Sequence, residues 1–208
     1  MTSTIGPGDS DVERRTAGDP GHLAPLLTTG QASALLARNR QQTDKVIRAC
    51  MSRFQTIGRN RLVDRDDLLR LRDRPRLGLG RGEPLALAVH LGPLVSTTPE
   101  ESDAGDTRPD RGFSATDDDW RKIWRWTRWW NIGPADTSYF TELNLPIIAD
   151  VSGFVVHVAR IVDWCPAPSG LGGVGFEVIE ADEDIRTSFA GHQYLPERGK
   201  NWQVLGRP

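Results

Sequence analysis

Apolar residues recur at helical spacing in two stretches near the start of the chain. A short apolar stretch, Leu26–Leu36, predicts a helical turn or two. Between Thr43 and Gly58 the apolar side chains repeat every three or four positions, which is typical of a helix with one buried face. Thr43 can cap the N-terminus of this helix, and Gly58 suits its end.

A second, shorter helix is expected from Asp64 to Arg72, ahead of the helix-breaking Pro75. Two helices joined by a short basic turn could form a helix-turn-helix. We do not favour that motif from the sequence, because the second helix is short and lacks a clear recognition face.

From Pro84 onward the pattern changes to strands separated by glycine and proline. An apolar run bounded by Pro84 and Gly92 predicts a buried strand, and apolar–polar alternation predicts others farther on. A long acidic loop separates them over Pro99–Asp119. The expected strands are Leu85–Leu91, Asp150–Trp164, Gly175–Ile179 and Trp202–Leu205, with a short helix over Asp182–Phe189. This order predicts an α+β fold or a small, partly open β-barrel with inserted helices.

Tryptophan is concentrated in one segment. Five of the seven tryptophans lie within Trp120–Ile132, where a helix would place aromatic residues on one side and arginines on the other. Such a face can pack into a core. The alternation of arginine and tryptophan also suggests nucleic-acid binding, because aromatic rings stack on bases and arginines bind phosphates. Both interpretations stay open at this point.

Composition and charge divide the chain into three parts. Residues 1–25 hold few apolar side chains and are expected to be disordered. Residues 26–82 are expected to form an arginine-rich helical arm, and residues 83–208 the folded domain. Residues 38–81 hold 13 basic and 5 acidic side chains, or +8, which leaves −10 on the remainder of a chain of net charge −2. This asymmetry suggests a basic arm for a polyanion, or an arm packed on the chain's own acidic surface.

Several kinds of site are disfavoured. The two cysteines form no CxxC pair, so both are expected to be small buried residues. The histidines lack metal-ligand spacing, and no phosphate-loop or dinucleotide motif is present. Glycine-rich Gly170–Gly175 lies between two expected strands and is not taken as a phosphate loop. We therefore expect no cofactor and no metal, and binding rather than catalysis.

No stretch of the sequence is long and apolar enough to span a bilayer, and the first residues lack the order of a signal peptide. We therefore expect no membrane partner and a cytoplasmic location.

Four short motifs follow one another over about 80 of the 208 residues. They are Trp130-Asn-Ile-Gly133, Gly153-Phe-Val-Val156 leading to Ile161-Val-Asp-Trp164, Phe189-Ala-Gly191 and Gly199-Lys-Asn-Trp202. This pattern resembles the PUA-like superfamily, whose members include EVE and SRA-type domains. The resemblance implies a small pseudo-barrel that reads modified bases or RNA in a pocket. The pattern requires neither the arginine-rich arm nor the long acidic loop.

We predict from these features a domain that binds DNA or RNA and reads a modified or flipped base in an aromatic pocket. The residues expected to contact the base are Trp130, Asn131, His157, Trp164, His192, Tyr194 and Trp202. Those expected to contact the phosphate backbone are Arg59, Arg61, Arg72, Arg74, Arg186, Arg198 and Lys200. Two alternatives remain: a small-molecule-binding or immunity-type protein with the same pocket, and a hydrolase or nuclease with a histidine and carboxylate site.

Overall fold

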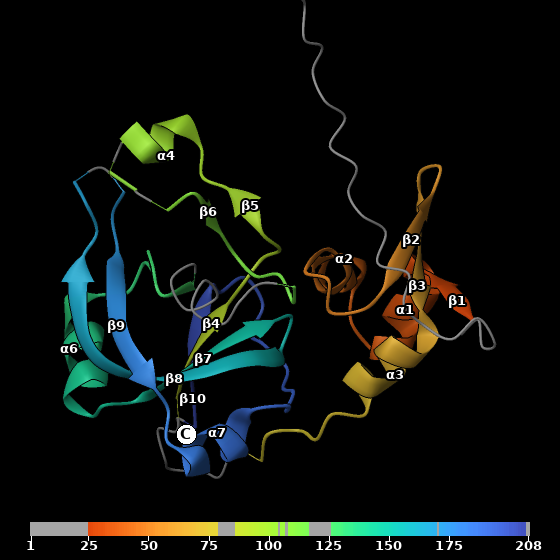
Figure 1. The fold of residues 1–208 in the computed structure, drawn as a ribbon. Helices are drawn as coiled ribbons and strands as arrows, with labels where there is room; N and C mark the ends of the chain where they lie inside the picture. The colour runs from red at the N-terminus through yellow and green to blue at the C-terminus, as the bar shows by residue number, and fades with distance from the viewer. Residues whose placement is uncertain are drawn as a thin grey trace, which may run out of the picture.

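The computed structural model describes residues 25–78, 86–103, 105–106, 108–116, 126–169 and 171–206, and its ribbon is drawn in Figure 1. The disorder expected for residues 1–25 therefore falls outside the described part, apart from Pro25. Residues 120–125 of the tryptophan-rich segment also fall outside it. Within the described ranges, no helix has the length and apolar character to cross a membrane.

The N-terminal part is a small α/β unit rather than a purely helical arm. Its elements are β1 (Leu26–Thr28), α1 (Thr29–Leu36), α2 (Arg40–Arg48), β2 (Phe54–Ile57), β3 (Asn60–Asp64) and α3 (Arg65–Arg72). The three strands form an antiparallel sheet in the order β1-β3-β2. The unit lies to the right of the larger C-terminal part in Figure 1.

Local caps set the helix boundaries of this unit. Thr28 with Gln31 forms a capping box at the start of α1, and Asn39 with Gln42 forms a second at the start of α2. Ala37 adopts a left-handed conformation (φ 51°) that ends α1. Asp64 accepts hydrogen bonds from two backbone amides in the first turn of α3, which confirms the predicted helix there.

The long helix predicted from Thr43 to Gly58 is wrong. Helix α2 ends at Arg48, and Cys50 takes a left-handed conformation (φ 56°) that turns the chain back. Residues Phe54–Ile57 then pair with β3 as a strand. Cys50 is also exposed rather than buried, contrary to expectation.

The C-terminal part is built on a five-stranded mixed sheet in the order β10-β4-β7-β8-β9. Its strands are β4 (Ala86–His90), β7 (Pro146–Val151), β8 (Phe154–Pro166), β9 (Val174–Glu180) and β10 (Trp202–Leu205). Strands β4 and β7 are parallel, and the other neighbours are antiparallel. The remaining elements are β5 (Val95–Ser96), α4 (Pro99–Asp103), β6 (Asp110–Arg111), α6 (Pro134–Glu142) and α7 (Glu183–Phe189).

Both faces of the central strands are buried. On one face Leu87 and Val89 join a large cluster that includes Trp126 and residues of α1 and α2. On the other face Ala86 and Ala88 join a smaller cluster under α7. This explains why β4 reads as a continuous apolar run rather than an alternating one.

The mixed α/β content is confirmed, whereas the PUA-like barrel is not, because none of the described sheets closes into a barrel. The strand predicted over Asp150–Trp164 is in fact two antiparallel strands, β7 and β8, joined by a tight turn. Gly153 in this turn has φ +87°, and a Cβ there would lie 2.2 Å from the Tyr194 carbonyl oxygen. The turn therefore requires glycine at this position.

Other predicted elements of the C-terminal part are confirmed. Three of the predicted strands appear as β4, β9 and β10, and the predicted helix after Asp182 appears as α7. The acidic loop Pro99–Asp119 carries structure of its own, in α4 and in β6, which pairs with β5 just ahead of the loop.

Candidate functional sites

Helices α1 and α2 are consecutive and are joined by a short turn. Only residues 37–39 separate them, and the two helices contact each other while α1 also packs on α3 and β3. The β2–β3 hairpin follows α2 and projects as a wing, with residues 55–60 all exposed (Figure 1). The unit thus consists of two helices joined by a short turn and followed by an exposed hairpin.

Two helices joined by a short turn are therefore present, but they are α1 and α2 rather than the two helices first considered. The two capping boxes were the signal that could have located it, because each marks a helix start in the sequence.

The outer face of α2 is basic and polar. Arg40, Gln41, Lys45 and Arg48 are exposed, whereas Thr43, Val46 and Ile47 are buried beneath the helix. Arg40 and Lys45 form no ion pair within the described part of the chain. Arg48 lies 3.9 Å from Asp44, which is bound more closely by Arg61 at 2.7 Å.

Helix α2 is fixed to the C-terminal part at both ends. The Ser152 hydroxyl donates to the Gln42 carbonyl oxygen at 2.9 Å, and the Ala115 amide donates to the Ala49 carbonyl oxygen at 3.0 Å. Arg38, in the preceding turn, donates to the Ser152 carbonyl oxygen at 3.1 Å. These bonds hold the exposed face of α2 in one orientation.

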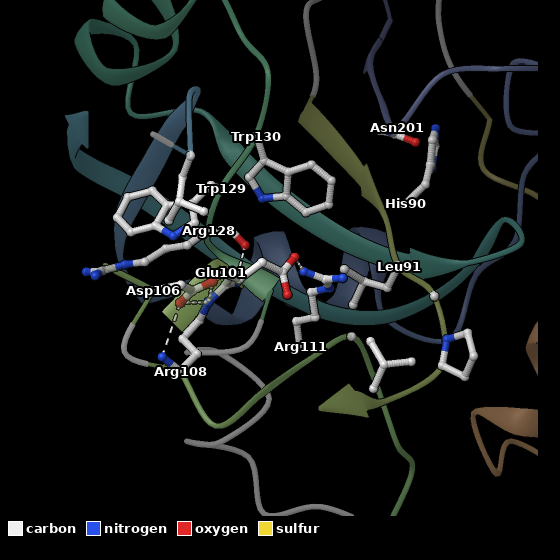
Figure 2. Close-up of a pocket in the computed structure, with 15 residues that line it drawn as sticks. His90, Leu91, Glu101, Asp106, Arg108, Arg111, Arg128, Trp129, Trp130 and Asn201 are labelled. Carbon is white, nitrogen blue, oxygen red and sulfur yellow. Dashed lines mark hydrogen bonds and ion pairs between the residues drawn. The ribbon is translucent and has the colours of Figure 1, made fainter. Parts of the chain in front are cut away.

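A second candidate site is a cavity of about 370 Å³ at the carboxyl ends of β4 and β7. One wall comes from the β5–β6 region and another from the segment before α6. Figure 2 shows its lining. The lining residues that matter below are His90, Asp106, Arg108, Arg111, Trp130 and Asn201.

Behind the cavity wall, a buried carboxylate orients His90. Asp150 is 0 % exposed and accepts three hydrogen bonds: from His90 Nδ1 at 2.6 Å, from the Tyr194 hydroxyl at 2.5 Å and from the Gly153 amide at 2.6 Å. Burial, together with the charge of Asp150, raises the pKa of Tyr194 well above its usual value. Tyr194 therefore stays a hydrogen-bond donor to Asp150 at any ordinary pH.

The hydrogen bond to Asp150 sets the tautomer of His90, because a carboxylate only accepts and so Nδ1 must carry hydrogen. The other ring nitrogen, Nε2, is buried and has no hydrogen-bond partner among the described residues. Buried polar atoms are nearly always hydrogen-bonded, so Nε2 of this cavity-lining residue lacks the partner that such an atom normally has.

The charged residues of the cavity wall are mostly paired with one another. Asp106 and Arg108 form a buried ion pair at 2.6 Å, and hydrogen bonds from Arg108 lower the pKa of Asp106. Arg111 pairs with Glu101. These pairs balance most of the charge that lines the cavity.

Trp130 is held rigidly at the cavity edge. Its indole Nε1 donates to the Trp126 carbonyl oxygen at 2.8 Å, and its backbone exchanges two hydrogen bonds with Val174. A Cβ on Gly173 would lie 2.6 Å from the Trp130 carbonyl oxygen, so the glycines here allow close packing of two backbones. This agrees with the expectation that Gly170–Gly175 connects two strands.

Of the predicted base-contacting residues, one lines this cavity and another lies directly behind its wall. Trp130 lines it, and Tyr194 contacts Asp150 behind it. Asn131 and Trp202 contact each other outside the lining, where Trp202 Nε1 donates to the Asn131 carbonyl oxygen at 2.9 Å.

The remaining three predicted contacts lie elsewhere. His157 packs edge-on against Trp126 at 5.5 Å, Trp164 pairs with Phe176 across β8 and β9, and His192 Nδ1 lies 3.1 Å from the Ala190 carbonyl oxygen. Neither Asp150 nor His90 is among the site residues expected from the sequence.

Most of the predicted phosphate contacts are engaged within the protein. Arg61, Arg72, Arg186 and Lys200 each pair with a carboxylate. Arg74 donates to the Val155 carbonyl oxygen at 2.9 Å, and burial lowers its pKa. Arg59 and Arg198 are exposed, and neither forms an ion pair with another described residue.

No family model matches this chain, and neither a curated protein nor a solved structure matches it at a significant level. We therefore infer the function from the geometry of the two sites.

Proposed function

We propose that this protein binds duplex DNA through its helix-turn-helix, with α2 as the recognition helix in the major groove. The observation that carries the proposal is the exposed polar and basic face of α2, placed directly after a three-residue turn and next to a wing. An α-helix fits the width of the major groove, where base edges can be distinguished.

The order of residues along α2 suits such docking. In helix-turn-helix proteins the first residues of the recognition helix contact base edges. Arg40 and Gln41 occupy the first turn, and these residue types pair with guanine and adenine respectively. Lys45 and Arg48 lie farther along the same exposed face, where a cation can neutralise backbone phosphates.

The wing supports the same interface. Arg59 lies at the exposed tip of the β2–β3 hairpin, and Arg61 in β3 pairs with Asp44 of α2. The ion pair ties the hairpin to the recognition helix, so both can contact one stretch of duplex. The net charge of +8 between Arg38 and Arg81 creates a positive electrostatic potential that attracts a polyanion such as DNA.

The earlier expectation of RNA or a flipped base in a PUA-like pocket receives less support. Only Trp130 of the seven predicted base contacts lines the cavity, and Tyr194 lies behind its wall. The order of the four motifs is the remaining support for that expectation. Duplex DNA fits the described surface better.

Fluorescence polarisation with labelled duplexes of mixed sequence tests the proposal. Arg40→Ala/Lys45→Ala removes two exposed cations of α2, and Arg72→Ala/Arg186→Ala is the matched control that removes two cations engaged with carboxylates elsewhere. We expect the first variant to bind about tenfold or more weakly. The slope of the logarithm of its binding constant against the logarithm of the salt concentration should become shallower by about one unit per lost phosphate contact. Equal weakening in both variants, or no binding by the wild type at low salt, would refute the proposal.

A further inference from the structure

The cavity at the ends of β4 and β7 is separate from the DNA-facing surface of α2. We propose that it is a binding site for a small, uncharged, planar aromatic molecule that carries an O–H or N–H donor. The volume of about 370 Å³ lies within the usual range of small-molecule sites. The proposal does not depend on DNA binding.

The requirement for a donor follows from His90. Its Nδ1 is committed to Asp150 at 2.6 Å, so in the neutral ring Nε2 carries a lone pair. Nε2 is buried, and no described residue satisfies it. A ligand hydroxyl or N–H can donate to this atom. Because Asp150 and Tyr194 hold the imidazole in one orientation, the acceptor is preorganised.

A neighbouring amide provides complementary polar groups. The His90 amide donates to the Asn201 carbonyl oxygen at 2.8 Å, which places the two residues next to each other at the end of their strands. The side chains of both line the cavity (Figure 2). Asn201 therefore offers a donor and an acceptor close to the His90 acceptor.

The preference for an aromatic ring follows from Trp130. Figure 2 shows its indole on the wall between His90 and the arginine-rich side of the cavity. Hydrogen bonds to Trp126 and Val174 fix both the ring and its backbone. A rigid indole gives a planar ligand a large contact surface at little entropic cost.

The preference for an uncharged molecule follows from the ion pairs within the cavity wall. Asp106 already neutralises Arg108, and Glu101 neutralises Arg111. The guanidinium of Arg128 stacks 5.3 Å from the Trp129 ring centroid and extends away from His90 and Trp130 in Figure 2. A charged ligand would have to break an existing ion pair, which a neutral one avoids.

A metal ion is not the expected occupant. Among the described residues, no group of three or more histidine, cysteine, aspartate or glutamate side chains could hold one. His90 supplies a single nitrogen, and the carboxylates of the lining are bound to arginines.

Isothermal calorimetry on the full chain without DNA, using three related probes, tests this proposal. The probes are 4-hydroxybenzamide, 4-methoxybenzamide, which lacks the phenolic donor, and 4-hydroxybenzoate, which adds a charge. We expect the hydroxyamide to bind, and each of the other two to bind about tenfold or more weakly. A thermal-shift panel of neutral phenols, indoles, benzimidazoles and purines extends the search across the ligand class.

His90→Asn provides the matched variant. The asparagine amide can still donate to Asp150 from the position of Nδ1, whereas Nε2 is deleted. We expect its melting temperature to stay near that of the wild type, while 4-hydroxybenzamide binds no more tightly than 4-methoxybenzamide does to the wild type. The proposal is overturned if no member of the panel binds at millimolar concentration. It is also overturned if His90→Asn leaves binding unchanged, or if the benzoate binds more tightly than the amide.

Discussion

Replacing Tyr194 by phenylalanine removes one hydroxyl group from the interior without leaving a large cavity. In the wild type this hydroxyl donates to the Asp150 carboxylate at 2.5 Å, and Asp150 is fully buried. Tyr194→Phe leaves that carboxylate with two of its three donors, His90 Nδ1 and the Gly153 amide. The substitution therefore isolates one hydrogen bond of the network that orients His90.

The magnitude follows from the charge and burial of the acceptor. A hydrogen bond to a charged group contributes about 1.5–3 kcal/mol to the free energy of unfolding, more than a bond between neutral partners. For a chain of 208 residues this corresponds to a fall in melting temperature of about 3–12 °C. The change in packing volume is too small to explain a loss of that size.

Urea unfolding followed by circular dichroism measures the effect, and a double-mutant cycle with Asp150→Asn assigns it. If the hydroxyl acts through Asp150, Tyr194→Phe should cost clearly less in the Asp150→Asn background, with a coupling of about 1 kcal/mol or more. A Tyr194→Phe variant within about 0.5 kcal/mol of the wild type would show that the buried network does not stabilise the fold as described.

Three further predictions concern the same region. Because the folded-state pKa of Tyr194 is raised above 10.0, unfolding releases its proton at high pH. The free energy of unfolding should thus fall as pH rises from about 9 to about 11, by up to ~1.4 kcal/mol per pH unit. The Tyr194→Phe variant should lack the part of this pH dependence that Tyr194 causes. Gly153→Ala should lower the free energy of unfolding by about 2 kcal/mol more than Gly172→Ala, since both have positive φ but only Gly153 lacks space for a Cβ; equal melting temperatures would contradict this. Saturation with 4-hydroxybenzamide should change the affinity for duplex DNA, because Ser152 links the Asp150 turn to Gln42 of α2; an unchanged Kd would show that the two sites are independent.

Much of the fold could be predicted because its signals are local. The apolar run of β4 and the cap at Asp64 each lie within a few residues of the element they define. The helix predicted over Thr43–Gly58 is wrong beyond Arg48 for an equally local reason. The apolar spacing continues from Val46 to Phe54 as if the helix went on, although Cys50 reverses the chain with a positive φ. Periodicity alone does not reveal a left-handed residue.

The cavity could not be predicted in the same way. His90 and Asp150 lie 60 positions apart and meet only because β4 and β7 pair in parallel, and nothing local encodes that pairing. The arginines pose a similar problem. A charge count does not show that Arg61 binds Asp44 or that Arg74 binds a backbone carbonyl, while Arg40 stays exposed.

Mapping the DNA-bound surface residue by residue tests most directly whether α2 is a recognition helix. Amide chemical shifts of the 15N-labelled protein can be followed as duplex DNA is added at low salt. We predict that the largest changes fall on α2, residues 40–48, and on the wing tip, residues 58–60. Amides of α7 and of residues 197–200 should change little. The largest changes at Arg186, Arg198 and Lys200, with α2 unaffected, would contradict this account.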